Sequence, residues 1–370
     1  MDKRLLLASP HMSGEGYELE YINDAFRKNW IAPLGENVNE FEKAMGTYMG
    51  KGYPVALSAG TAALHLAMIL AGVKRGDAVF CQSLTFSASA NPVVYCGAKP
   101  VFIDSERETW NMDPAALRHA FELYGVPKAV VAVHLYGNPA KMDEITAICH
   151  EHNVPLIEDA AEALGSTYNG QKCGTFGEFG GLSFNGNKII TTGAGGMVVS
   201  NHADWAEHAK HLSTQAKADM LQFLHDEVGY NYRMTNVQAS LGIAQLERLE
   251  GFIAHKKALY DRYVAALDGV KGLRILPFRE EACRSNHWFF SLYVKDAGLD
   301  RDTVIEKLQA QQIQTRPVWA LIHEQADYPR NEAYGLDKAL DYRKYIVNLP
   351  CSTNLSFEDC DRVIEAVLGL

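Results

Sequence analysis

Residues 128–165 read KAVVAVHLYGNPAKMDEITAICHEHNVPLIEDAAEALG, and this stretch decides the fold class. Two continuous apolar runs, at 129–133 and 154–157, flank a segment at 142–153 that reads as a helix. Continuous Val, Ile and Leu runs that alternate with helices are typical of a parallel sheet covered by helices on both faces. The stretch therefore predicts an α/β fold.

The same alternation extends in both directions along the chain. From residue 236 the pattern changes to one long amphipathic helix, followed by a strand at 286–294 and a helix at 302–313. We expect a large domain over residues 1–249 and a smaller C-terminal α+β domain over 250–370. The segments expected in the large domain are strands at 54–60, 77–83, 99–104, 180–186 and 195–200, with helices at 61–72 and 113–125.

Composition excludes several classes of function. The chain has 370 residues, 47% of them apolar and 22% charged, which is enough apolar material for a sizeable core. A net charge of −10 argues against nucleic acid as the main partner. No apolar run approaches the 18 residues of a membrane span, and Leu5–Ala8 is too short for a secretory signal. Seven scattered cysteines fit reduced thiols, and we expect a cytoplasmic protein.

A turn at the end of the first expected strand has the features of an anion site. In SAGTAALH, Ser58, Gly60 and Thr61 lie where the strand turns into a helix. Backbone N–H groups at a helix N-terminus, with a threonine hydroxyl beside them, bind phosphate. An ordinary turn with a helix cap is the alternative interpretation.

Two acids and one lysine complete the pattern. Glu158 and Asp159 end a hydrophobic strand, where an acid caps a helix, forms a buried ion pair, or holds a protonated ring nitrogen. Lys188, in SFNGNKIITTGAGG, is either a surface turn lysine or an enclosed amine able to form a covalent bond to a carbonyl. The order of phosphate turn, strand-end acid and lysine matches aminotransferase-type pyridoxal phosphate enzymes.

Three stretches carry a more specific resemblance: 158–180 (EDAAEALGSTYNGQKCGTFGEFG), 183–200 (SFNGNKIITTGAGGMVVS) and 229–247 (GYNYRMTNVQASLGIAQLE). They resemble the sugar aminotransferases of the DegT/DnrJ/EryC1/StrS family. The resemblance implies a fold type I, aspartate-aminotransferase-like structure, pyridoxal 5′-phosphate, L-glutamate as amino donor and a nucleotide-linked keto sugar as acceptor. It also implies a homodimer with shared active sites.

The resemblance assigns a role to individual residues. Lys188 matches the lysine that bonds the cofactor, and Asp159 matches the acid that faces the pyridine nitrogen. The remaining matches are Gly60, Thr61 and Ser183 for the phosphate, Phe86 for stacking on the ring, Glu162 near the ring hydroxyl, Asn231 for the cofactor phosphate of the neighbouring subunit, and His323 for the substrate.

Two further stretches of sequence indicate which sugar nucleotide is the substrate. Residues 9–42 and 134–145 are similar to one branch, the aminotransferases of N-acetylbacillosamine synthesis, which aminate C4 of a UDP-linked 4-keto-6-deoxy-N-acetylglucosamine. GDP-perosamine synthases share a motif similar to NYRMTN, so a GDP-4-keto-6-deoxymannose aminotransferase is an alternative.

Two other functions remain as alternatives: a sugar dehydratase and a regulator without catalytic activity. A sugar dehydratase of the same fold would carry histidine in place of Lys188, and a non-catalytic regulator would lack part of the set. We expect no metal site, because His208 and His211 stand at helical spacing but have no third partner.

Overall fold

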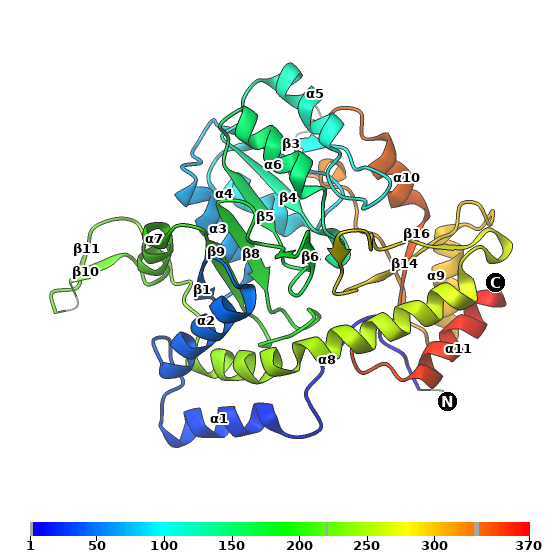
Figure 1. Ribbon diagram of the computed structural model, residues 1–370, viewed down its shortest axis with the longest axis horizontal. Coiled ribbons are helices and arrows are strands. Elements are labelled where there is room, and N and C mark those ends of the chain that lie inside the picture. The colour runs from blue at the N-terminus through cyan, green and yellow to red at the C-terminus, as the bar shows by residue number, and fades with distance from the viewer. Residues whose placement is uncertain (1–2, 220, 329–332) are drawn as a thin grey trace.

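The centre of the protein is a seven-stranded sheet. The computed structural model describes residues 3–219, 221–328 and 333–370 (Figure 1). Within the sheet, β9 is antiparallel to both of its neighbours and the other strands share one direction, so the predicted, mainly parallel sheet is confirmed. In spatial order the strands are β1 (Tyr53–Leu57), β9 (Gly196–Ser200), β8 (Phe179–Ser183), β5 (Leu156–Asp159), β4 (Ala129–Val133), β2 (Ala78–Gln82) and β3 (Lys99–Ile103).

Helices cover both faces of this sheet. Successive side chains of a strand point to opposite faces. In β4, Ala129 and Val131 therefore join one apolar cluster, and Val130 and Ala132 join the other. The first cluster packs under α3 (Gly60–Leu70), α4 (Asn91–Tyr95) and α7 (Ala203–Ser213), and the second under α5 (Pro114–Tyr124) and α6 (Met142–Glu151).

A single long helix joins the two parts of the chain. Helix α8 (Asn236–Leu267) has 32 residues and begins with a capping box, in which Thr235 Oγ1 accepts a hydrogen bond from Gln238 N at 3.3 Å. It packs against α1 (Tyr17–Arg27) and α2 (Glu36–Met49) near its start and against α11 (Phe357–Leu368) near its end (Figure 1). The predicted domain boundary at residue 250 falls inside this helix.

The C-terminal part contains its own antiparallel sheet, as expected for an α+β unit. Its strands, in spatial order, are β12 (Arg274–Ile275), β14 (Phe290–Tyr293), β16 (Ile346–Leu349) and β15 (Arg316–Pro317). Helices α9 (Arg301–Ala310) and α10 (Asp337–Tyr345) belong to the same part. No helix in the described residues is long and apolar enough to span a membrane.

The N-terminal residues lie on this C-terminal part. Leu5 N donates to Gln312 O at 2.9 Å, Cys351 N donates to Leu7 O at 2.8 Å, and Ser9 N donates to Ser352 Oγ at 3.0 Å. Residues 5–9 were expected to belong with the large domain by position in the sequence. Their hydrogen bonds attach them instead to segments more than 300 positions later.

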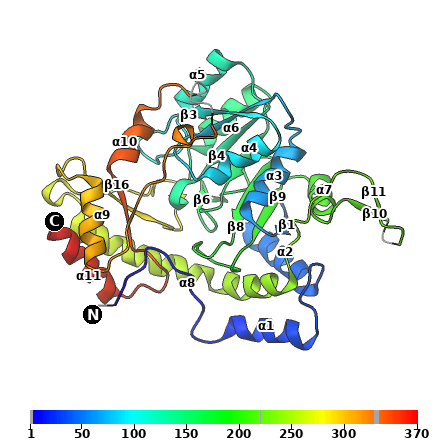
Figure 2. The same ribbon diagram turned by 180° about the vertical axis from the view of Figure 1, so that it is seen from behind.

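Two small β structures complete the fold. A three-stranded sheet contains β13 (Cys283–Arg284), β6 (Thr167–Tyr168) and β7 (Gln171–Lys172). A hairpin formed by β10 (Lys217–Asp219) and β11 (Leu224–His225) projects beyond α7, away from the rest of the molecule (Figures 1 and 2).

Glu158 fixes the edge of the sheet at which the predicted site residues gather. Its two carboxyl oxygens accept hydrogen bonds from the backbone N–H groups of Gly174 (2.7 Å), Phe176 (2.6 Å) and Gly177 (2.8 Å). His134 Nε2 lies 2.9 Å from the same carboxylate, and because His134 Nδ1 accepts from Ala140 N, the ring carries its hydrogen on Nε2. All four partners donate, so this fully buried acid is structural.

We expect Glu158→Gln to destabilise the protein by about 3 kcal/mol, because an amide NH₂ would then face backbone donors and charge-assisted hydrogen bonds would be lost. Urea unfolding of the variant measures this loss. Glu151→Gln is the control, since Glu151 lies in an exposed pair with Arg118 and such a pair contributes about 0–1 kcal/mol. Equal small effects of the two substitutions would show that the Glu158 network does not stabilise the fold.

Candidate active site

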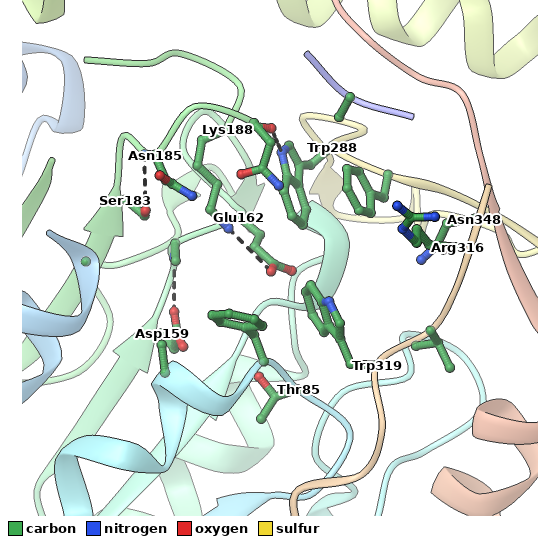
Figure 3. Close-up of a pocket in the computed structure, with 18 of the residues that line it drawn as sticks. Thr85, Asp159, Glu162, Ser183, Asn185, Lys188, Trp288, Arg316, Trp319 and Asn348 are labelled. Atoms are coloured by element: carbon green, nitrogen blue, oxygen red, sulfur yellow. Dashed lines mark hydrogen bonds and ion pairs between the residues drawn. The ribbon is translucent and has the colours of Figure 1, made fainter. Parts of the chain in front are cut away.

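One large cavity opens where the strands of the main sheet end, beside the C-terminal part (Figure 3). Its volume is about 820 Å³. Asp159 and Ser183 are the last residues of β5 and β8, so the strand ends form its floor. The predicted site residues that line the cavity are Gly60, Thr61, Phe86, Asp159, Glu162, Ser183 and Lys188.

Gly60 and Ser183 form a close approach at one side of the cavity. Gly60 is the first residue of α3, and Ser183 ends β8. A Cβ atom on Gly60 would lie 2.9 Å from Ser183 Cβ and 3.2 Å from Ser183 Oγ, so only glycine fits there. The N–H groups of the first turn of α3, the Thr61 side chain and the Ser183 hydroxyl therefore border one space, which suits a phosphate.

Asp159 presents a carboxylate held by neutral donors. Its Oδ2 accepts from Ser89 Oγ at 2.5 Å, and Ser89 Oγ lies 2.7 Å from Thr85 Oγ1. Its Oδ1 accepts from Ala161 N at 3.1 Å. These hydroxyl and amide contacts orient the group and leave its negative charge available to a cationic ligand atom in the cavity.

Lys188 lies on the loop between β8 and β9, and its side chain is enclosed. The side chain is 11% exposed, and Nζ lies 3.5 Å from Glu162 Oε1. Nζ also lies 4.0 Å from the centre of the Trp288 ring (Figure 3). An amine held in this way is not a surface turn lysine, and it faces the same cavity as Asp159.

Glu162 is the second acid of the cavity, three positions after Asp159. Its Oε2 accepts a hydrogen bond from Tyr136 N at 2.7 Å. Burial raises the pKa of the Glu162 carboxyl to about 7, against the opposing effect of the Lys188 ammonium. Near neutral pH this group therefore exchanges a proton readily.

Comparison with known proteins now identifies the family. The sequence profile of the DegT/DnrJ/EryC1/StrS aminotransferase family matches residues 13–368. The chain belongs to this family.

Individual relatives agree with this assignment. EpsN of Bacillus subtilis, described by name as a pyridoxal phosphate-dependent aminotransferase, is 46% identical over 100% of this chain and 96% of its own length. The GDP-perosamine synthase of Caulobacter vibrioides is 38% identical over 98% of this chain and 97% of its own length. Among solved structures, the aminotransferase TlmJ from Streptoalloteichus hindustanus superimposes with a TM-score of 0.91 at 29% identity, covering 99% and 98% of the two chains.

Membership establishes the general activity and the fold. The protein is a pyridoxal phosphate-dependent aminotransferase that acts on nucleotide sugars, and its fold is type I, as the sequence predicts. The cavity fits the cofactor: the Gly60–Ser183 approach leaves room for a phosphate, Asp159 offers a carboxylate, and Lys188 offers an enclosed amine.

Phe86 lines the cavity from the segment that follows β2. Its side chain is 52% exposed, and its ring centroid lies 5.5 Å from that of Trp319. An aromatic face this open to the cavity is available to a flat ligand, so its stacking role stays a prediction that the geometry permits.

Asn231 and His323 are not among the described residues that line the cavity. Asn231 is exposed and forms an isolated bridge with Thr214. His323 Nδ1 lies 2.7 Å from Ser83 Oγ, and its ring lies 6.4 Å from that of Phe102. Their expected roles, in the partner's cofactor site and in substrate binding, stay predictions.

The two histidines of α7 have acidic neighbours that sequence spacing did not reveal. His211 Nε2 lies 2.7 Å from Asp226 Oδ1, and His208 Nε2 lies 2.6 Å from Glu227 Oε1. The ligand atoms of His211, Asp226 and Glu227 lie within 4.8 Å of one another. These pairs attach the projecting hairpin to α7.

Sequence reasoning missed the aromatic and cationic wall of the cavity. Trp288, Trp319 and Arg316 all line it (Figure 3), and Asn187 lines it as well. Trp288 lies within NHWFFSLYV, which sequence analysis interpreted as a strand, and an aromatic residue inside an apolar run is indistinguishable from core. Arg316 is the only one whose charge gave a local signal of exposure to a ligand or to solvent.

The raised pKa of Glu162 predicts how stability depends on pH in cofactor-free protein. Its ordinary pKa is 4.5, and its folded value is about 7. At Glu162 the folded state therefore binds more protons than the unfolded state between these values, and the contribution of this group to wild-type stability falls as pH rises through this window. Glutamine does not titrate, so we expect Glu162→Gln to gain about 3 kcal/mol relative to wild type between pH 4.5 and pH 8.

Urea unfolding at several pH values measures this difference. A difference between variant and wild type that stays constant across the pH range would contradict the buried, proton-binding state of Glu162.

Proposed function

We propose that this enzyme transfers the amino group of L-glutamate to C4 of a UDP-linked 4-keto-6-deoxy-N-acetylhexosamine. The observation that carries the chemistry is the enclosure of the Lys188 amine in the cavity that also presents Asp159 and the Gly60–Ser183 approach. Support for UDP and the N-acetyl sugar comes from residues 9–42 and 134–145, which are similar to the aminotransferases of N-acetylbacillosamine synthesis.

The cofactor would be held by residues of three kinds. Gly60, Thr61 and Ser183 would hold the phosphate, Asp159 would keep the ring nitrogen protonated, and Phe86 would cover the ring face. When bound, pyridoxal phosphate supplies a carbonyl that accepts the amino group and a protonated ring that withdraws electrons from the reacting carbon.

Lys188 would carry the proton in this proposal, with Glu162 beside it. The Lys188 amine would hold the carbonyl carbon of the cofactor, and its Nζ would take the proton from the nitrogen-bearing carbon of glutamate. Nζ would take this proton as the neutral amine, and the Glu162 carboxylate, 3.5 Å away, would stabilise the resulting ammonium. Nζ would deliver a proton to C4 of the sugar, so that glutamate and keto sugar give 2-oxoglutarate and amino sugar.

A homodimer with shared sites is part of the proposal. Asn231 is exposed in the single chain and would reach the cofactor phosphate of a partner. The neighbouring hairpin presents apolar side chains to solvent, with Leu221 90% and Phe223 67% exposed. Apolar surface on a projecting hairpin favours contact with a second subunit.

One alternative acceptor has specific support. The identity of 38% to a GDP-perosamine synthase favours GDP-4-keto-6-deoxymannose as the second candidate. Lys188 argues against sugar dehydration, because dehydrating relatives carry histidine at this position.

We expect Lys188→Ala to form no borohydride-reducible bond to pyridoxal phosphate and to lose at least about a thousandfold in turnover, since both the covalent link and the proton carrier are removed. Peptide mapping after borohydride reduction locates the adduct in the wild type. Lys257→Ala, at an exposed pair with Asp261, is the matched control and should retain the adduct on Lys188. A wild-type adduct on another lysine would overturn the assignment.

The acceptor is tested with a panel of UDP-, GDP- and dTDP-linked 4-keto-6-deoxy sugars and glutamate, with the amino sugar identified by mass. We expect kcat/KM for the UDP-linked N-acetyl sugar to exceed the others at least about tenfold, equivalent to about 1.4 kcal/mol of transition-state binding. A preference for the GDP-linked sugar would select the alternative. If none of these sugars is aminated, the proposed activity is wrong.

A further inference from the structure

Trp288 occupies a fixed position just before β14. Its side chain is 2% exposed, and its ring stacks on Phe289 with centroids 3.9 Å apart and planes 6° from parallel. Its backbone N donates to Tyr136 O at 3.2 Å. Ring and backbone are therefore both held in place before any ligand enters the cavity.

The same indole contacts two consecutive residues of the loop between β8 and β9. Its Nε1–H donates to the backbone oxygen of Asn187 at 2.8 Å. Its ring face lies 4.0 Å from Lys188 Nζ. One contact fixes the peptide before the lysine, and the other holds the end of the lysine side chain.

The Glu162 carboxylate and the Trp288 ring form two walls beside the Lys188 amine. Glu162 Oε1 lies 3.5 Å from Lys188 Nζ, and Glu162 Oε2 accepts from Tyr136 N at 2.7 Å. Because Tyr136 also accepts the Trp288 backbone hydrogen bond, both walls are attached to one residue, whose side chain is fully buried. The spacing between carboxylate and indole is thus set by the scaffold (Figure 3).

We propose that Trp288 is a positioning residue that holds the free ammonium of Lys188 against its indole face, with Glu162 beside the same atom, and so returns the amine to one place whenever it leaves the cofactor. This inference rests on the proposed reactivity of Lys188. A lysine side chain has a flexible four-carbon stem and many rotamers. An aromatic face that attracts a desolvated cation restricts these rotamers and keeps the reacting atom aligned.

The first test uses cofactor-free protein, with a brief pulse of acetic anhydride at fixed pH and quantification of Lys188 labelling by peptide mass spectrometry. A desolvated cation–π contact protects the ammonium, so we expect Trp288→Leu to be labelled about fivefold to thirtyfold faster. Trp288→Phe keeps an aromatic face and should stay within about twofold of wild type. Trp30→Leu removes an exposed indole that does not line the cavity, and should also stay within about twofold.

A second measurement weakens the cation–π contact without the loss of packing that Trp288→Leu causes. Site-specific replacement of Trp288 by mono-, di- and trifluorotryptophan keeps the shape of the ring and its N–H. Each fluorine withdraws electrons and makes the ring face less negative. We expect the labelling rate of Lys188 to rise stepwise with each fluorine. A rate that stays at the wild-type value throughout the fluorinated series overturns the proposal.

Turnover separates this role from the proposed function. We expect Trp288→Leu to lower kcat at least about tenfold while KM for glutamate and for the sugar changes less than about threefold, and Trp288→Phe to recover most of kcat. Borohydride mapping of the wild type reports on the reactivity of Lys188 independently. An adduct on Lys188 with unchanged kcat in Trp288→Leu would refute only the positioning role, whereas no adduct on Lys188 would refute the proposed function.

Discussion

The alternation of side chains at the end of β5 is the constraint on which the site depends. Because successive strand residues point to opposite faces, the side chains of Glu158 and Asp159 cannot both face the cavity. Glu158 binds the 174–177 turn, which leads directly into β8, and a Cβ on Gly180 of β8 would lie 2.1 Å from Gly174 O. One acid thus sets the position of the strand whose end carries Ser183 and the lysine loop, while its neighbour faces the cavity.

The two acids inside the cavity differ because their surroundings differ. Asp159 is bound by a hydroxyl and a backbone amide, which both donate to its carboxyl oxygens. Glu162 is buried with one backbone donor, and its charge depends on the nearby ammonium. A buried carboxyl whose pKa is raised to about 7, beside an amine, suits a reaction in which that amine alternates between bound and free states.

The sequence predicted the mainly parallel sheet and its covering helices, because the strands and helices around residues 128–165 differ in local pattern. It also predicted the cavity's acids, glycine and lysine, since these residues stand out at strand ends. It could not predict that β9 runs against its neighbours, that residues 5–9 attach to the C-terminal part, or that Trp288 contacts Lys188. Each of these depends on contacts between segments far apart in the chain, and Trp288 carries the same local signature as a core residue.

The attachment of residues 5–9 has a consequence for biosynthesis. Leu7 N donates to Gln314 Oε1 across 307 positions, and Leu7 and Ala8 line the cavity wall. Contacts at such separation form late, because the long intervening chain must be ordered first. In a nascent chain, residues 5–9 therefore lack these hydrogen-bond partners until residues 312–314 and 351–352 have been translated. The part of the cavity wall formed by Leu7 and Ala8 is thus among the last parts of the site that synthesis can complete.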